Sequence, residues 1–487
     1  MILKVISKYG LAAHLGLLAA FPVAFSLVLG ADALGKVMLW LSLFAVVWVF
    51  FDPSIRIGER SSEARIRVAS SIIRDPVFYI FVAISVFALV RWLNSGITLW
   101  YDAEQSVWVV KSASAPMLPA STADAGFLPM AASVALLVVV IGVRHALGLS
   151  ARLFCGLTAV SVTGLGGLVS SVCACLGKDA SFIQAARADF MHTPFVGVAF
   201  GVFLLVAVAF GAAAESRKWA YARLPYVLAV AGTSSGLVFF APPAAAAVCL
   251  TVILLFLVFA LFYCARSGTL GGCARTGVFT FLGVAISMLL IMALASSDLQ
   301  QFKLQGLNPE LIVPVEYGTV RDALARISRG MWLERPWCGA GVGAYPLHVP
   351  FIAVKADWSV LPANVANGLS GYWTLLAERG IVGCAFLAVG LGALVWSWGA
   401  RLVAAFMFLR GNDEADIFPF ACPPVVWTAP FVLALAVAEM MFSNSFASPA
   451  SVFALIFPLA LSAASFPRKV PPPVAQAGES DQDGKSL

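Results

Sequence analysis

The feature that most constrains this chain is a series of apolar segments, each close to twenty residues long. One of them, Ala244 to Cys264, contains no charged residue. An α-helix needs about 20 mostly apolar residues to cross the hydrocarbon core of a bilayer. Only 11% of the 487 residues are charged, against about 25% in soluble domains. The sequence therefore predicts an all-α polytopic membrane protein.

Twelve apolar segments are predicted to cross the membrane. They are residues 11–30, 34–51, 76–95, 127–146, 153–176, 194–214, 225–241, 244–264, 278–296, 372–398, 424–442 and 450–466. The segment 225–241 is short and contains the sequence GTSSG, which favours a bent or broken helix. The first segment is followed directly by a second and lacks a small-residue cleavage site, so we interpret it as a retained helix.

The lysines and arginines predict the orientation, because cytoplasmic loops carry an excess of them. With a cytoplasmic N-terminus, most of the 31 basic residues fall in inside segments, so both termini are expected to be cytoplasmic. The outside segment 96–126 is interpreted as a surface loop or lid. The predicted organisation is nine transmembrane helices in 1–296, a large partly helical outside loop in 297–371, three helices in 372–466 and a disordered tail in 467–487.

The segment RDALARISRGMWLERPWCGAGVGAY, which begins at Arg321 inside the long loop, is unlike the rest of the sequence. Apolar residues recur at the spacing of one helix face, and Pro336 is predicted to end that helix. The apolar residues of this face are Val320, Leu324, Ile327 and Met331. The glycines that follow permit backbone turns that side chains forbid, and they are Gly339, Gly341 and Gly343.

The arginines of this predicted helix suggest an anion site. Arg321 and Arg329 are eight residues apart, about 80° around a helix axis, so both can face one polar groove, with Arg326 nearby. Arginine binds phosphate through paired hydrogen bonds and stays charged at any relevant pH. The simpler alternative is that these arginines pair with neighbouring carboxylates and lipid headgroups.

The order of these motifs resembles the O-antigen ligase and polymerase family of bacterial inner-membrane glycan transferases. The sequence TVR ends at Arg321, Pro336 follows fifteen residues later, and GAGVGAY comes next. The sequence YWTLLAERGIVG then runs from Tyr372 to Gly383. The predicted twelve spans and the large periplasmic loop between the ninth and tenth agree with this resemblance.

The resemblance implies a multi-pass glycosyltransferase of cell-envelope polysaccharide biosynthesis that needs no cofactor or metal. It would move a glycan from undecaprenyl pyrophosphate to an acceptor hydroxyl, on a lipid A core sugar of lipopolysaccharide for a ligase or on a growing chain for a polymerase. Arg321 would stabilise the leaving pyrophosphate, and His348 is the candidate base. The candidate substrate-binding residues are Arg326, Arg329, Gly339, Gly341, Gly343, Tyr345, Tyr372 and Glu378.

Two departures from the family pattern keep other functions open. The family's His-Asn pair falls at Leu369 and Ser370, and no basic residue follows the seventh predicted span where the family has an arginine. A catalytically inactive relative is one alternative. A lipid-linked-glycan transporter or flippase is another, although it would favour charged residues at mid-membrane, and the predicted spans have almost none.

Several single residues also have simpler interpretations. Glu378 and the adjacent Arg379 can form a salt bridge that fixes a helix end. Tyr345 and Tyr372 can anchor the chain at the membrane interface, and His348 can be an ordinary surface histidine. The expected partners are membrane lipids and the lipid-linked glycan rather than nucleic acid. The sequence does not predict an oligomeric state.

Overall fold

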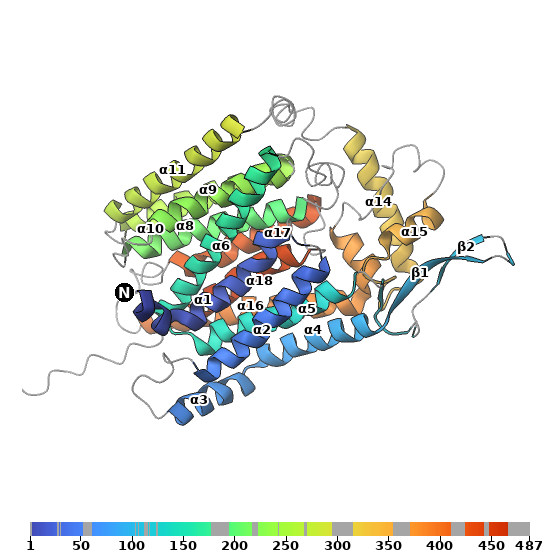
Figure 1. Ribbon diagram of the computed structural model, residues 1–487, viewed down its shortest axis with the longest axis horizontal. Coiled ribbons are helices and arrows are strands. Elements are labelled where there is room, and N and C mark those ends of the chain that lie inside the picture. The colour runs from blue at the N-terminus through green and yellow to red at the C-terminus, as the bar shows by residue number, and fades with distance from the viewer. Residues whose placement is uncertain are drawn as a thin grey trace, which may run out of the picture.

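The computed structural model is a bundle of long helices with a smaller group of elements at one end (Figure 1). It describes residues 2–51 (except 27, 28 and 30), 61–176 (except 103, 106, 112–114, 116, 123 and 124), 194–216, 223–266 (except 242), 270–294, 315–353, 371–410, 424–442 and 448–465. The predicted tail 467–487, the residues Leu369 and Ser370 and parts of the long loop lie outside these described residues.

The helices follow the apolar segments of the sequence. In the first half they are α1 (Ile2–Phe25), α2 (Ala31–Phe51), α3 (Ser61–Ile73), α4 (Pro76–Leu93), α5 (Phe127–Ile141), the π-helix η2 (Gly142–Ala146) and α6 (Leu149–Leu176). In the second half they are α8 (Pro194–Ser216), α9 (Arg223–Phe240), α10 (Pro243–Arg266), α11 (Leu270–Leu294), α14 (Val315–Glu334), α15 (Tyr345–Ile352), α16 (Gly371–Arg410), the short 3-10 helix η6 (Pro424–Trp427), α17 (Thr428–Phe442) and α18 (Pro449–Ala464).

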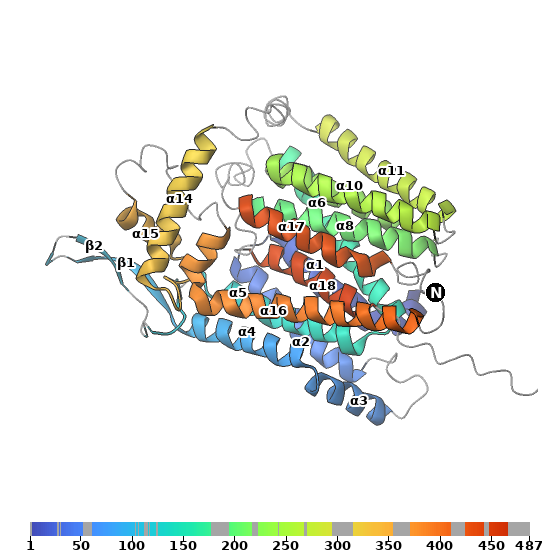
Figure 2. The same ribbon diagram turned by 180° about the vertical axis from the view of Figure 1, so that it is seen from behind.

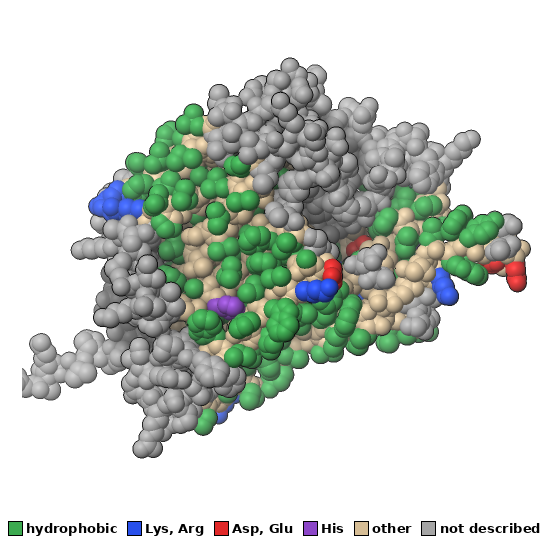
Figure 3. All heavy atoms as spheres, viewed as in Figure 1, with side chains coloured by type: hydrophobic (Ala, Val, Ile, Leu, Met, Phe, Trp, Pro, Cys, Tyr) green, Lys and Arg blue, Asp and Glu red, His purple; other side chains and the backbone are tan. Residues whose placement is uncertain are grey.

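The helix lengths and their apolar composition are those of a helical membrane protein. Five helices in the described part of the chain are long and apolar enough to cross a bilayer. They cover Pro76–Leu93, Phe127–Ala146, Leu149–Val172, Arg223–Phe240 and Gly371–Ala404. Hydrophobic side chains also cover most of the described helical surface in Figure 3, as expected of a surface that faces lipid. Each of the twelve segments predicted from the sequence overlaps a helix.

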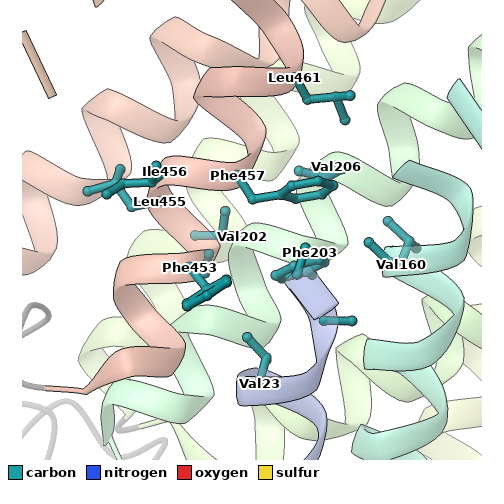
Figure 4. Packing of buried hydrophobic residues seen from close by; sticks show 14 of the residues in the cluster. Val23, Val160, Val202, Phe203, Val206, Phe453, Leu455, Ile456, Phe457 and Leu461 are labelled. Atoms are coloured by element: carbon teal, nitrogen blue, oxygen red, sulfur yellow. The ribbon is translucent and has the colours of Figure 1, made fainter. Parts of the chain in front are cut away.

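The core of the bundle forms where α1, α6, α8 and α18 meet. Figure 4 shows Phe203 of α8 close to Phe457 of α18, and their rings stack with centroids 6.2 Å apart. The segment 225–241, predicted to be a bent or broken helix, is not broken, because α9 is an uninterrupted helix. Its small residues allow close helix packing instead: a Cβ atom added at Gly232 would collide with the backbone of Gly164 on α6.

The prediction of a purely α-helical chain needs a correction in the segment 96–126, which contains a three-stranded sheet rather than a simple loop. The strands β1 (Ser95–Asp102), β2 (Val107–Lys111) and β3 (Ser121–Thr122) are ordered β2-β1-β3. The β1–β2 pair is antiparallel and the β1–β3 pair is parallel. The aromatic and β-branched residues of ITLWY and VWVV favour such strands. The segment as a whole is rich in Ser, Ala and Pro, and this is why it was interpreted as a surface loop or lid.

Two ends of the bundle can be distinguished. The hairpin β1–β2 lies with α14, α15 and the start of α16 at one end, which we call the α14 end. The N-terminus and α3 lie at the opposite end, which we call the α3 end, and Figure 2 shows the same separation from behind. The helix α4 connects them, with Asp75 before its first residue and Arg91 in its last turn.

Candidate functional site

The helix α14 packs against the start of α16 and against α15. Leu324, Ile327 and Met331 are fully buried and form a small core with Tyr345 and Ala377. These are the residues of the apolar face predicted from the sequence, except that the side chain of Val320 lies outside the described residues. The helix ends at Glu334, just before Pro336, because proline lacks the backbone donor that another turn would need.

The loop after α14, which contains Gly339, Gly341 and Gly343 and which we call the glycine loop, is hydrogen-bonded to α16. Gly339, Gly341 and Gly343 have φ values of 76°, 113° and 76°, which confirms the predicted turns. Gly341 donates its backbone N–H to the Glu378 carbonyl at 3.1 Å. A Cβ atom at Gly339 would lie 2.5 Å from the carbonyl carbon of Glu378. The loop therefore needs glycine both for its dihedral angles and for its close approach to α16.

The same loop lies against a break in the helix α16. Gly380 has φ 64° and ψ −175° inside the helix, so the hydrogen-bond ladder of α16 is interrupted there. The next two donors bond outward: the N–H of Ile381 to the Pro336 carbonyl at 2.9 Å, and the N–H of Val382 to the Trp337 carbonyl at 3.0 Å. The backbone donors of Ile381 and Val382 therefore have acceptors despite the break. The break also places Glu378 and Arg379 at the end of a short helical segment.

Beside this break, charged side chains from two helices gather. Glu378 is only 6% exposed, and its Oε1 accepts a hydrogen bond from the Gly343 N–H at 3.2 Å. Arg91, on α4, is 3% exposed and lies within electrostatic range of Glu378 and Arg379. Ser121 of β3 donates its hydroxyl to the Arg91 carbonyl at 3.2 Å, so the sheet fixes this end of α4.

The guanidinium groups of Arg91 and Arg379 both interact electrostatically with the carboxyl group of Glu378. The buried Nε of Arg91 has no hydrogen-bond partner among the residues that the structure describes. A buried charged donor without a partner is costly, so the arrangement suits an additional anionic ligand.

A cavity begins at these two arginines. It offers about 70 Å³ of space to a water-sized molecule, between α4, α5, α16 and α18. Among the residues that the structure describes, Arg91 and Arg379 are the charged ones that line it, and its other walls are almost entirely apolar, with Phe81, Phe87 and Phe453 among them. Because helices rise 1.5 Å per residue, the wall from Arg91 to Phe81 is about 15 Å long. The cavity thus combines a cationic end with a long apolar body.

The structure places most of the arginines and the histidine predicted from the sequence elsewhere. Arg321 lies on α14, and its side chain is outside the described residues. Arg326 and Arg329 are exposed on the same helix. His348, on α15, is buried, with its Nδ1 3.9 Å from a carboxylate oxygen of Glu334. No residue of α14 or α15 lines the described cavity.

The chemistry of these loop residues follows from their burial. Burial lowers the pKa of His348, and the nearby positive charge of Arg335 lowers it further, so this imidazole is neutral at pH 7. Tyr345 is fully buried and donates its hydroxyl to the Leu324 carbonyl at 3.0 Å. The interpretation of Tyr345 as an interface anchor was therefore wrong, since it is a core residue. Tyr372 is 43% exposed.

Arg91 was missed by the sequence analysis although a signal was present. It is a single arginine inside the predicted span 76–95, and ionisable residues in spans mark functional sites more often than chance. In the structure, the described part of the long loop 297–371 forms hydrogen bonds to α16 around the break at Gly380, close to Arg91.

A second buried charged cluster lies at the α3 end. Asp75 accepts hydrogen bonds from Arg144 Nε at 2.9 Å and from His145 Nε2 at 2.7 Å. Arg144 also donates to the hydroxyl of Ser397 at 2.9 Å. Arg152 donates to backbone carbonyls, including that of Val143 at 2.8 Å. Each of these side chains has a partner at hydrogen-bond distance.

None of the described residues forms a group of three or more His, Cys, Asp or Glu side chains that could hold a metal ion. The candidate site is therefore the Arg91–Arg379–Glu378 group with its apolar cavity.

No protein-family model, no curated protein and no solved structure matches this chain.

Proposed function

We propose that this protein is an O-antigen ligase- or polymerase-like glycosyltransferase. It moves a glycan from undecaprenyl pyrophosphate to an acceptor hydroxyl, on lipid A core or on a growing chain, at the periplasmic face of the bacterial inner membrane. In this proposal about twelve helices cross the membrane, the termini are cytoplasmic and the α14 end is periplasmic. The large loop between the ninth and tenth spans then contains α14 and α15.

The observation that carries the proposal is the cavity with two arginines at one end. A polyprenyl chain is apolar and its pyrophosphate is anionic, which matches the apolar walls and the cationic end. Arginine is suited to phosphate because its planar donors bond two oxygens at once. The buried Nε of Arg91, which has no partner among the described residues, supports an anion as its ligand.

The transfer reaction explains why cations are needed there. The acceptor oxygen forms a bond to the anomeric carbon of the glycan, the bond from that carbon to the pyrophosphate oxygen breaks, and the proton of the acceptor hydroxyl passes to water. The departing pyrophosphate gains negative charge in the transition state. In this proposal Arg91 and Arg379 stabilise that charge, while Glu378 keeps the two guanidinium groups in position. Arg321 and His348 keep no assigned step.

The test is a transfer assay with purified protein in liposomes that contain the undecaprenyl-pyrophosphate-linked glycan and an acceptor. Arg91→Gln should lower the rate of transfer by roughly 100-fold or more, the usual effect of losing one preorganised donor to a developing anion. The matched control is Lys36→Gln, because Lys36 is an exposed cation of α2 paired with Asp32 and lies outside the cavity. It should transfer at the wild-type rate.

Two results would contradict the proposal. Full activity of Arg91→Gln would show that the cavity takes no part in the transfer reaction. A wild-type protein that binds or moves the lipid-linked glycan across the bilayer without transferring it would favour the transporter or the inactive relative.

A further inference from the structure

The hairpin β1–β2 carries exposed aromatic side chains at the α14 end. Trp100 and Trp108 are 54% and 55% exposed, and Tyr101 is 43% exposed. The hairpin extends away from the helix bundle (Figure 1). Monomeric proteins seldom expose several large aromatic residues together unless a ligand or partner covers them.

One face of the hairpin extends from the protein core to the exposed rings of Tyr101 and Trp108. Tyr101 pairs with Trp108 across the strands, with ring centroids 5.1 Å apart. Because side chains alternate along a strand, Ile97 and Leu99 lie on the same face as Tyr101. Ile97 is 2% exposed against Ala120 and Ala344, so this face passes from buried to open.

The opposite face has a different composition. Trp100 lies there, and the Lys111 ammonium sits 5.9 Å from the centre of its ring. Asp102 belongs to the same face, and its carboxylate accepts the backbone N–H of Glu104 at the tip. The face that carries Trp100 therefore has charged groups near its aromatic ring.

The base of the hairpin is fixed to the candidate site. β1 begins directly after α4, which carries Arg91 in its last turn. Thr122 of β3 donates its N–H to the Val342 carbonyl at 3.0 Å, and Val342 donates to the Ala120 carbonyl at 3.2 Å. Val342 belongs to the glycine loop that holds Glu378. A ligand on the hairpin would thus be held at a set position relative to the two arginines.

We propose that the β1–β2 hairpin is a saccharide-binding surface, on which sugar rings of the glycan stack against Trp108 and Tyr101 and against Trp100. This inference rests on the proposed function, because it gives the glycan a place beyond the carrier site. A sugar ring has an apolar C–H face that packs on an aromatic ring, and hydroxyls that bond to groups such as Asp102 and Lys111.

A bilayer is a poorer occupant than a saccharide. The acidic residues Asp102 and Glu104 lie toward the tip, Figure 3 shows acidic side chains there, and charged carboxylates do not enter a bilayer at low cost. A protein partner is also less suited, since protein interfaces have a contiguous apolar centre. Here the rings are divided between the two faces of a narrow ribbon.

The experiment measures binding of soluble polysaccharide to the full-length protein in lipid nanodiscs by calorimetry. The probe is the polysaccharide released by mild acid from the lipid-linked glycans of the source organism. The variant combines Trp100→Ala, Tyr101→Ala and Trp108→Ala. Its binding should weaken roughly tenfold or more, since each stacked ring contributes a substantial part of a tenfold change in affinity. The control Trp396→Ala, at a 79% exposed position of α16, should bind normally.

Two further measurements separate this inference from the proposed function. The triple variant should bind undecaprenyl pyrophosphate without sugar as the wild type does, whereas Arg91→Gln should lose that lipid and keep polysaccharide binding. Trp108→Phe should retain most of the affinity and guards against a misfolded hairpin. Wild-type polysaccharide binding by the triple variant would overturn the inference, as would no binding by the wild type. A loss of particle mass in the triple variant with unchanged polysaccharide binding would assign the hairpin to a protein partner.

Discussion

Two clusters of buried arginines, one near each end of the bundle, differ in how their charges are paired. At the α3 end, Arg144 is bonded to the Asp75 carboxylate and to Ser397. At the α14 end, Arg91 and Arg379 share the vicinity of one carboxylate, Glu378, and the Nε of Arg91 lacks a partner among the described residues. Both clusters remove arginine from water, but only the α14 end adjoins the cavity.

The difference separates an architectural role from a binding role. A matched buried ion pair fixes helices, and loss of one partner leaves an uncompensated charge. A buried guanidinium such as that of Arg91, whose Nε has no hydrogen-bond partner among the described residues, costs stability and is expected where a ligand supplies the partner. The pairing at Asp75 outweighs the effect of its burial: the hydrogen bonds from His145 and Arg144 hold the pKa of that carboxyl below its usual range.

The largest predicted effect on stability is that of Arg144→Gln. It leaves the buried carboxylate of Asp75 without its guanidinium partner and should lower the free energy of unfolding by about 3–5 kcal/mol. Arg91→Gln leaves Glu378 beside Arg379 and should lower it little or not at all. Thermal unfolding in one detergent measures both variants. Equal destabilisation of the two variants would contradict the proposed difference between the two ends.

The break in α16 should tolerate no side chain. Gly380→Ala places a Cβ atom against the Trp337 carbonyl at a positive φ, and should destabilise the protein by about 1–3 kcal/mol. It should also lower transfer, because Glu378 and Arg379 move with the break. The control is Gly392→Ala, whose added Cβ meets no atom within 4 Å and which should be neutral or slightly stabilising. A Gly380→Ala protein as stable and as active as the wild type would show that the α14 end does not depend on this break.

The smallest effect is the pH dependence due to His348. Its folded pKa is lowered by burial and by Arg335, so the unfolded chain binds the proton first. Its contribution to stability is present above the unfolded pKa of about 6.5 and is lost as the pH falls through the folded pKa. His348→Gln should flatten the stability curve between pH 7 and pH 5, measured by thermal unfolding. An unchanged slope would mean that His348 is accessible to protons in the folded state. A wild-type transfer rate for this variant would also remove the base role expected from the sequence.

The sequence predicted what depends on local patterns. The helices follow from the long apolar segments, the buried face of α14 from its helical spacing, and the turns at Gly339, Gly341 and Gly343 from their lack of a side chain. These features are determined by neighbours along the chain.

The site was less predictable because it depends on contacts between distant segments. Arg91 and Arg379 are far apart in the sequence, and only the packing of α4 against α16 brings them to one cavity. Tyr345 has the composition of an interface anchor, yet α14 covers it. The break at Gly380 can be understood only with the carbonyls of Pro336 and Trp337, which its following residues need as acceptors.

The most direct test of the central claim is a structure of the protein in nanodiscs with undecaprenyl pyrophosphate added. The phosphates should lie between the guanidinium groups of Arg91 and Arg379, with the polyprenyl chain along Phe81 and Phe453. Phosphate density at Arg321, Arg329 or His348 with an empty cavity would contradict the account.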